Sequence, residues 1–460
     1  MAVRPNVLLI MADQQRGDCL GVENHPCLMT PSLDAIAHTG TRFRRAYSSC
    51  PLCIPARRSL MTGTFPSTHG VVGYAKDQEL VGLTTLPQAF SAAGYHTAMV
   101  GWSMDLYPPR KRFGFDEMTI SEDYLRFLEE NMPEGAGGHF GSGVMINDWT
   151  AHPWHLEDNL HTTNWTANRA LDFLRRRDPS CPYFLTVSFL APHPPLHPPA
   201  FYFERYLRTG VPDPVLGEWA QPPPGGMTAL EPDAANVNLR GEALLSTRAA
   251  YYGLINHLDD QIRRILNRDT GIGRERETIV VFVSDHGEML GDHYFARKSQ
   301  PYEGSVRVPF LVQLPSAWEA PRGQVVDAPV CLEDLMPTLL DLCDISVPST
   351  VEGASLKPFL VGKPPPAFRE FVPLEHSGGW HALTDGREKY IWHSRTGAEQ
   401  FFDLVADPQE RRDLAPSCEE RVAPWRALLI ERLANRPEGF AENGKLKPGH
   451  PHRAVIPYQA

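Results

Sequence analysis

The sequence lacks the features that mark a nucleic-acid-binding or membrane protein. No Lys/Arg-rich block interrupts its 460 residues, and 44 basic against 55 acidic residues leave a net charge of −11. An acidic chain without a basic stripe offers no electrostatic footprint for a nucleic acid. The apolar run at residues 7–12 is too short to span a bilayer. We therefore expect neither a nucleic-acid partner nor a membrane.

We expect neither a secretory leader nor a disulfide framework. No small-residue cleavage region follows the first apolar run. The eight cysteines are spread between Cys19 and Cys418, and free thiols are the rule in a reducing compartment. We expect a cytoplasmic protein whose cysteines are reduced.

Apolar runs alternate with amphipathic segments along most of the chain. Runs at residues 7–11, 96–101, 183–189, 278–284 and 308–312 predict buried strands. Helices are expected between Pro31 and Gly40 and at residues 87–94, 163–177 and 244–268. The Pro-rich stretch 191–226 is expected to be a loop. This alternation predicts an α/β fold with a mostly parallel central sheet flanked by helices.

The texture of the sequence changes after Lys363-Pro-Pro-Pro366. Short β-type runs at residues 371–374, 380–383, 389–392 and 400–404 predict a smaller C-terminal antiparallel sheet, and residues 419–434 predict a helix. We therefore expect two domains, a large α/β domain over residues 1–365 and a small α+β domain with a tail over residues 366–460.

Polar side chains follow three of the predicted strands directly. Asp13 and Gln14 come after the first strand, His193 after the third, and Asp285 and His286 after the fourth. Ligands of open α/β sheets bind beyond the carboxyl ends of the strands. Carboxylate and amide oxygens suit Ca²⁺ or Mg²⁺, and an imidazole nitrogen extends the choice to Mn²⁺. The sequence thus predicts a divalent metal site.

Cys53 lies just ahead of a short predicted helix. Pro55 fits the first turn of this helix, and Gly63 ends it. The N–H groups and dipole of a helix N-terminus favour an anion, and Arg57 adds a positive charge in the first turn. This pattern indicates a nucleophile aimed at an anionic substrate. The alternative is a buried cysteine beside an incidental Pro and Arg.

The stretch Cys53-x-Pro55-x-Arg57, followed by Leu60, Thr62 and Gly63, resembles the maturation motif of type I sulfatases in the alkaline phosphatase superfamily. The resemblance covers roughly residues 4 to 415. Further matching positions are Asp13, Thr30-Pro31, Pro192-His193, the segment Ser284 to Glu288, Lys298, Arg307 and Asp407-Pro408. The resemblance implies an alkaline-phosphatase-like fold.

The same resemblance implies a set of site residues. A maturation enzyme would oxidise Cys53 to formylglycine, whose hydrate attacks the ester of a small molecule, and Arg57 would stabilise it. The formylglycine would share a divalent cation with four side chains, namely Asp13, Gln14, Asp285 and His286. Ca²⁺ is expected first, with Mn²⁺ or Mg²⁺ as alternatives. His193 and Lys298 would contact the ester, with His193 as the acid for the leaving group.

One segment departs from the family pattern. Sulfatases usually carry Gly-Lys-x-His after the second strand, whereas this chain has Gly101-Trp102-Ser103-Met104-Asp105. Phosphonate monoester hydrolases also lack that Lys and His. We expect Trp102, Ser103, Asp105 and Tyr74 to contact the substrate.

Three functions follow. The first is hydrolysis of sulfate esters, as in arylsulfatases. The alternative is hydrolysis of phosphonate monoesters or phosphodiesters at the same site. A catalytically degenerate anion-binding protein is the third, and a homo-oligomer is left open. The His/Trp-rich residues 149–161 either line the substrate pocket or pack against the domain.

Overall fold

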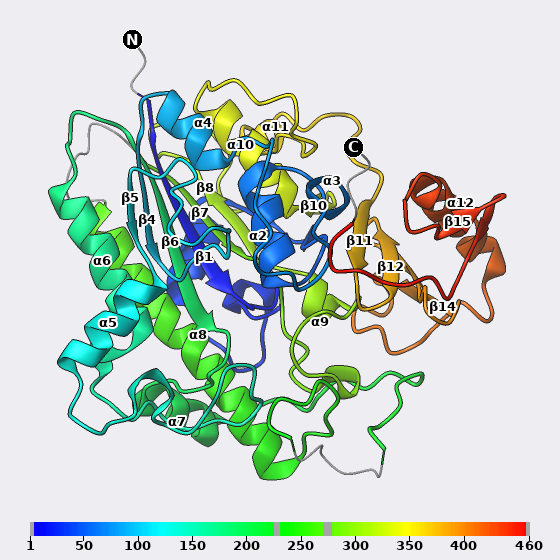
Figure 1. Cartoon of the computed structure of the whole chain (residues 1–460), viewed down its shortest axis with the longest axis horizontal. Coiled ribbons are helices and arrows are strands. Elements are labelled where there is room, and N and C mark those ends of the chain that lie inside the picture. Colours follow the sequence, from blue (N-terminus) through cyan, green and yellow to red (C-terminus); the bar gives the residue numbers. More distant parts are fainter. Residues whose placement is uncertain (1–3, 225–230, 270–277, 457–460) are drawn as a thin grey trace.

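The computed structural model describes residues 4–224, 231–269 and 278–456. Its centre is an eight-stranded sheet in the order β5-β4-β6-β1-β7-β8-β2-β9 (Figure 1). These strands are β1 (Asn6–Asp13), β2 (Thr41–Phe43), β4 (His96–Gly101), β5 (Glu117–Thr119), β6 (Tyr183–Pro192), β7 (Thr278–Ser284), β8 (Phe310–Gln313) and β9 (Gln324–Val326). All neighbours pair in parallel except β8, which is antiparallel to both β7 and β2. The predicted mostly parallel sheet is confirmed.

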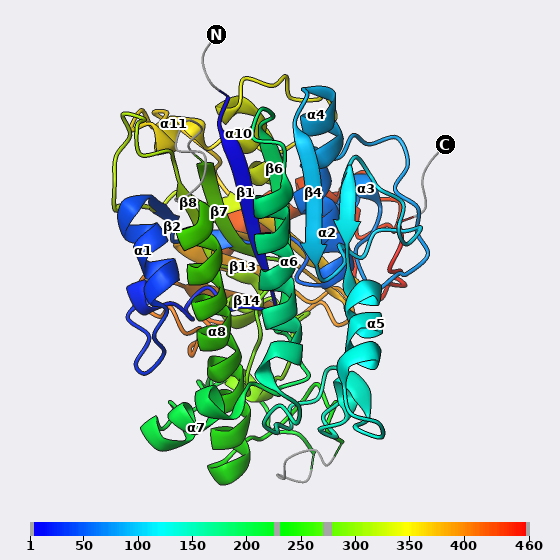
Figure 2. The same ribbon diagram turned by 90° about the vertical axis from the view of Figure 1, so that its left-hand side faces the viewer.

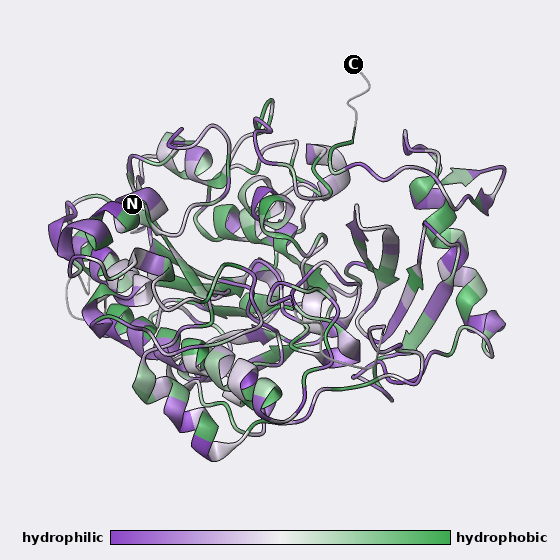
Figure 3. Ribbon diagram, turned by 60° about the horizontal axis from the view of Figure 1, so that its bottom comes forward, coloured by the Kyte–Doolittle hydropathy of each residue, from purple (hydrophilic) through white to green (hydrophobic). Residues whose placement is uncertain are grey.

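Helices cover both faces of this sheet (Figure 2). One face packs against α1 (Pro31–Thr39), α6 (Thr162–Arg176) and α8 (Gly241–Asp269), and the other against α2 (Cys53–Thr62), α4 (Leu86–Ala92), α10 (Leu335–Leu342) and α11 (Lys357–Leu360). Successive β1 residues alternate between the layers: Leu8 and Ile10 join the first cluster, Leu9 and Met11 the second. Figure 3 accordingly colours the central strands largely hydrophobic.

One expectation about the chain path is wrong. The Pro-rich stretch 191–226 contains a helix, α7 (Ala200–Thr209), within its described part. Pro199 is the N-cap of this helix, and the ten helical residues themselves contain no proline. The apolar side of α7 packs against α8 through Phe203 and Tyr206, which are buried with Ile255. The prolines at the two ends of the segment therefore led to the prediction of a loop, although the residues between them form a helix without an internal proline.

The remaining elements are short connections around these layers. They are η1 (Gly21–Glu23), β3 (Ala46–Tyr47), α3 (Pro66–His69), α5 (Ser121–Asn131), η2 (Gly138–Phe140), η3 (Asp158–Leu160), η4 (Asp292–Tyr294), α9 (Glu303–Val306), β10 (Val330–Cys331) and η5 (Leu332–Asp334). None of the helices in the described ranges is both long and apolar enough to cross a membrane. All eight cysteines are free.

The C-terminal part forms the expected antiparallel sheet. Its strands are β11 (Val372–His376), β12 (Trp380–Thr384), β13 (Glu388–Trp392) and β14 (Glu399–Asp403), followed by α12 (Glu419–Leu433) and a hairpin of β15 (Ala441–Glu442) and β16 (Lys445–Leu446). One side of the sheet packs on α12 through Tyr390 and Phe401. The other packs on the main body, where Ile391 and Phe402 meet Tyr302. The domain boundary at residue 365 stays a prediction.

A cluster of buried histidines lies outside the sheet. The rings of His161 and His197 are 5.5 Å apart, and each contacts Trp154. His161 also contacts His257 at 4.9 Å. Burial lowers the pKa of His257 to about 3 and holds the pKa values of His161 and His197 well below the usual range. Within the His/Trp-rich stretch, Trp154 and His161 therefore pack against the domain instead of lining the substrate pocket.

This cluster predicts a loss of stability in mild acid. The folded state keeps these imidazoles neutral, whereas the unfolded chain protonates them near pH 6.5, so stability is complete above that pH and falls below it. Each such histidine removes up to about 1.4 kcal/mol per pH unit below 6.5. Urea denaturation between pH 7.5 and 5 measures how the free energy of unfolding changes with pH. His257→Gln should make this dependence less steep, and the exposed control His38→Gln should leave it unchanged. Equal slopes for wild type and His257→Gln would contradict this origin.

Candidate active site

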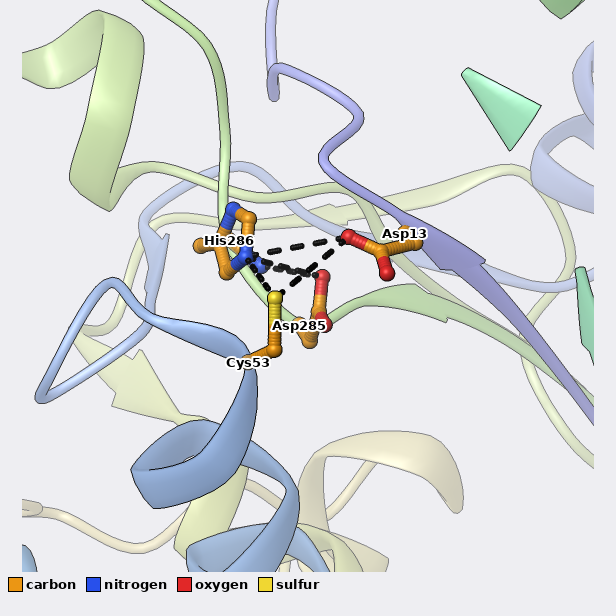
Figure 4. A group of neighbouring side chains, drawn as sticks. All are labelled: Asp13, Cys53, Asp285 and His286. Carbon is orange, nitrogen blue, oxygen red and sulfur yellow. Dashed lines mark hydrogen bonds and ion pairs between the residues drawn. The ribbon is translucent and has the colours of Figure 1, made fainter. Parts of the chain in front are cut away.

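The carboxyl ends of three adjacent strands and the start of one helix meet at a single point. Strand β1 lies between β6 and β7 in the sheet, so the residues that end or follow these strands are neighbours. β1 supplies Asp13, the turn after β7 supplies Asp285 and His286, and Cys53 is the first residue of α2 (Figure 4). The fold thus brings together side chains that lie up to 273 positions apart in the sequence.

Four of these side chains form a candidate metal centre. One ligand atom from each of Asp13, Cys53, Asp285 and His286 lies within 4.8 Å of all the others. Both carboxylates are almost completely buried, at 2% exposure for Asp13 and 0% for Asp285. Burial, and next the facing charge of Asp285, raises the pKa of Asp13 to about 6. Two buried carboxylates directed at one point are a typical arrangement for a divalent cation.

The tautomer of His286 suits this centre. Its Nδ1 lies 3.1 Å from the carbonyl oxygen of Gly287, and since a carbonyl only accepts, Nδ1 carries the hydrogen. Nε2 therefore presents a lone pair, 3.2 Å from the Sγ of Cys53 and 3.7 Å from oxygens of Asp13 and Asp285. A backbone hydrogen bond that fixes the other ring nitrogen is the usual support of a metal-ligating histidine.

The side chain of Gln14, which we expect to be a further metal ligand, is held in place by Glu288. The amide nitrogen Nε2 of Gln14 donates to the carboxylate of Glu288, while its Oε1 accepts from the Nζ of Lys298 at 2.8 Å. Because Glu288 only accepts, it turns the amide oxygen of Gln14 toward the site. The sequence pattern does not predict this role for Glu288, although the residue ends the matched segment that begins at Ser284.

Arg57 lies beneath the centre and is completely buried. Its guanidinium donates to Asp13, to Asp285 at 3.0 Å and to Asp105 at 2.6 Å. Burial opposes its charge, but Asp105, Asp13 and Asp285 together hold the pKa of Arg57 well above its usual value. Every side of the guanidinium is therefore occupied by protein, including a 2.6 Å bond to the carbonyl of Ser103. Arg57 orients both metal-facing carboxylates instead of facing the pocket.

Lys298 and His193 form a hydrogen-bonded pair above Cys53. The Nζ of Lys298 lies 3.4 Å from the Sγ of Cys53 and 2.7 Å from the Nε2 of His193. His193 donates its Nδ1–H to the carbonyl of Pro194 at 2.6 Å, so its Nε2 accepts from the ammonium group. Burial, together with Lys298, lowers the pKa of His193 to about 4. Burial opposes the charge of Lys298, but Cys53, Asp13 and Asp285 raise its pKa.

A pocket of about 970 Å³ opens over Cys53, His193 and Lys298. All four residues expected to contact substrate line it, namely Tyr74, Trp102, Ser103 and Asp105. Asp105 does so with its carboxylate bound to Arg57. The sequence did not indicate that the C-terminal sheet also forms part of the wall, through His376 at the end of β11 and the two residues that follow.

Two family descriptions match this chain: Sulfatase, over residues 5–345, and N-sulphoglucosamine sulphohydrolase, C-terminal, over residues 291–436. The chain therefore belongs to the sulfatase family and is a sulfuric ester hydrolase with the alkaline-phosphatase-like fold.

Individual proteins resemble it over nearly their full length. An arylsulfatase of Clostridium perfringens is 40% identical, with 98% of each chain covered. An ulvan-active sulfatase of Formosa agariphila is 30% identical over 98% of this chain and 87% of its own. The crystal structure of a phosphonate monoester hydrolase of Agrobacterium radiobacter superimposes with a TM-score of 0.78 at 26% identity, covering 94% of this chain and 95% of that one.

The contact between Glu288 and Gln14 predicts that replacing the carboxylate of Glu288 by an amide weakens metal binding. In Glu288→Gln, the new side-chain oxygen can still accept from the backbone N–H groups of Leu290 and Arg297. Its NH₂ group, however, meets the NH₂ group of Gln14 and forces that amide to turn over. The metal site then loses an oxygen donor, and Ca²⁺ affinity should fall about 10- to 100-fold. Isothermal titration calorimetry measures the dissociation constant, and an unchanged value would show that Gln14 is not held in this way.

Proposed function

We propose that the protein hydrolyses sulfate monoesters of small molecules through a formylglycine that a maturation enzyme makes from Cys53. The observation that carries this proposal is the position of the Cys53 side chain. Its Sγ lies 3.2 Å from His286 and 3.4 Å from Lys298, at the base of an open pocket and at the N-terminus of α2. The Sγ atom of Cys53 therefore marks the place that the oxygen atoms of the formylglycine hydrate would occupy.

We propose Ca²⁺ as the metal, held by the side chains of Asp13, Gln14, Asp285 and His286. Three of these four ligands offer hard oxygen atoms, which Ca²⁺ prefers. The single imidazole keeps Mn²⁺ as the alternative. When both are bound, the cation and the formylglycine hydrate supply a Lewis acid and a nucleophilic oxygen.

The charges around the site explain why an anionic ester needs the cation. Among the charged side chains that contact Arg57 or Cys53 directly, three carboxylates (Asp13, Asp105 and Asp285) meet two basic groups, Arg57 and Lys298, so this set has a net charge of about −1 without metal. A divalent cation changes this to about +1, which attracts a sulfate group. The site can therefore bind an anion even though the whole chain carries a charge of −11.

Lys298 and His193 are suited to bind the ester and to protonate the leaving oxygen. The ammonium of Lys298 is the positive group that lines the pocket directly beside Cys53. Because Nε2 of His193 accepts from Lys298, the proton for the leaving alcohol is shared by this pair and does not belong to His193 alone. This changes the role expected for His193 from the sequence.

Phosphonate monoesters are the second candidate substrates. The Agrobacterium radiobacter neighbour is a hydrolase of this kind, and the segment Gly101 to Asp105 lacks the Lys and His usual in sulfatases. The higher identity to an arylsulfatase, 40% against 26%, favours sulfate esters as the main substrates.

Conversion of Cys53 can be tested by mass. In protein expressed together with a formylglycine-generating enzyme, mass spectrometry of the peptide containing residue 53 should show the aldehyde or its hydrate. Cys53→Ala should lower kcat on 4-nitrophenyl sulfate by at least about 1,000-fold, because the nucleophile is lost. Cys50→Ala is the matched control, since Cys50 is buried and lies outside the metal centre. Undiminished turnover by Cys53→Ala would refute the nucleophile assignment.

The two substrate classes can be ranked directly. We expect kcat/KM for 4-nitrophenyl sulfate to exceed that for 4-nitrophenyl phenylphosphonate by at least about tenfold with Ca²⁺ bound, a difference of about 1.4 kcal/mol in transition-state binding. Both activities should vanish together in Cys53→Ala. A preference for the phosphonate, with either Ca²⁺ or Mn²⁺, would reverse the ranking.

A further inference from the structure

The pocket wall carries a cation that the chemistry described above does not use. Besides Lys298, the pocket is lined by Lys76, Arg110, Lys111 and Arg297. Arg110 is paired with Asp123 at 2.8 Å, and Lys111 with Glu79 at 2.6 Å. Lys76 is exposed and lies 5.4 Å from the ring centre of Tyr74. Arg297, by contrast, is half-buried, and its guanidinium has no ion pair or hydrogen bond to any residue in the described ranges.

The backbone of Arg297 is held in an unusual conformation. Its φ of +66° is in the left-handed region, which residues other than glycine rarely adopt. The backbone N–H of Arg297 donates to Glu288, the residue that also holds Gln14 at the metal centre. Such strained conformations persist only where surrounding contacts impose them, and they are concentrated at functional sites. The backbone of Arg297 is thus fixed next to Lys298, and both residues line the pocket.

The guanidinium of Arg297 is reachable from the pocket, because none of its nitrogens is among the buried atoms without a partner, and it is therefore free to bind a ligand. Arginine presents a planar set of donors that matches a carboxylate or sulfate group in bidentate fashion. The sulfate undergoing reaction is bound beside Cys53 and Lys298, so Arg297 is available for a different group of the same substrate. Trp102 and Tyr74 line the pocket as well and offer aromatic surface for the ring of the alcohol part.

We propose that Arg297 binds a second anionic group, a carboxylate or another sulfate, on the alcohol part of the substrate. Arg297 thereby makes the enzyme selective for sulfate esters of acidic alcohols. This proposal rests on the proposed sulfatase function and adds a substrate class to it. The contribution of one charged bidentate contact corresponds to about a 10- to 100-fold preference over an uncharged analogue.

The test uses three aryl sulfates that differ in one substituent. They are 3-carboxyphenyl sulfate, benzene-1,3-diyl bis(sulfate) and the uncharged 3-carbamoylphenyl sulfate. The mature wild-type enzyme should show at least about tenfold higher kcat/KM on one of the two dianions than on the carbamoyl compound. Whichever dianion is preferred identifies the second group as a carboxylate or a sulfate.

Variants then assign this preference to Arg297. Arg297→Gly should remove it while keeping the melting temperature close to that of wild type, because glycine accepts the left-handed backbone. Arg297→Lys should restore part of it. Lys111→Ala is the matched control and should keep the preference, since Glu79 already neutralises that cation. Equal kcat/KM on all three esters, or a preference that persists in Arg297→Gly, would overturn the proposal.

A binding measurement separates this proposal from the sulfatase function. Ca²⁺-loaded Cys53→Ala protein binds the esters without turning them over, so calorimetry gives the dissociation constants directly. The preferred dianion should bind at least about tenfold more tightly than 3-carbamoylphenyl sulfate, and Arg297→Gly added to Cys53→Ala should abolish this difference. Such a difference without turnover by the mature enzyme would refute the function but keep the anion site. Equal dissociation constants together with normal turnover would refute the second anion site and leave the sulfatase function standing.

Discussion

The buried contacts of Arg57 are the constraint on which the active site depends. A guanidinium with no exposure to solvent needs negative partners, and three carboxylates provide them. Two of these, Asp13 and Asp285, face the metal centre, and the third, Asp105, belongs to the loop that lines the pocket. One side chain of α2 thus ties together strands β1 and β7 and the segment after β4. Loss of Arg57 would remove the positive group that contacts both buried carboxylates, Asp13 and Asp285, directly.

The sheet order explains how these groups are brought to one place. β1 lies between β6 and β7, and polar residues at or just after their carboxyl ends meet α2. Glu288 then connects the metal centre to the pocket wall, because it binds the side chain of Gln14 and the backbone of Arg297. The position of the metal ligands and the shape of the substrate pocket are therefore linked by a single carboxylate.

The central strands and most of the principal helices could be predicted because they consist of long apolar or amphipathic runs. The predicted ranges of β4 and β7 agree with the structure at both ends. Asp13, Gln14, Asp285 and His286 could also be predicted as candidate metal ligands, since each lies at or just after the end of a strand, whereas Cys53 was predicted from its place at a helix N-terminus. Helix α7 was missed because its flanking prolines suggested a loop.

The pairing of Arg57 with Asp105 and the roles of Glu288 and Arg297 could not be predicted. Each depends on which of several polar or charged groups meet across 9 to 274 positions of sequence. Local sequence patterns do not predict such contacts between distant residues.

The proposed activity requires a metal ion and an oxidised residue 53 at one site. A crystal structure of the matured protein grown with Ca²⁺ tests both together. We predict one ion bound by Asp13, Gln14, Asp285 and His286, with metal–oxygen distances of about 2.3–2.6 Å, and an aldehyde hydrate at residue 53 directed at that ion. A structure with an unmodified cysteine, or with the ion bound elsewhere, would contradict the account.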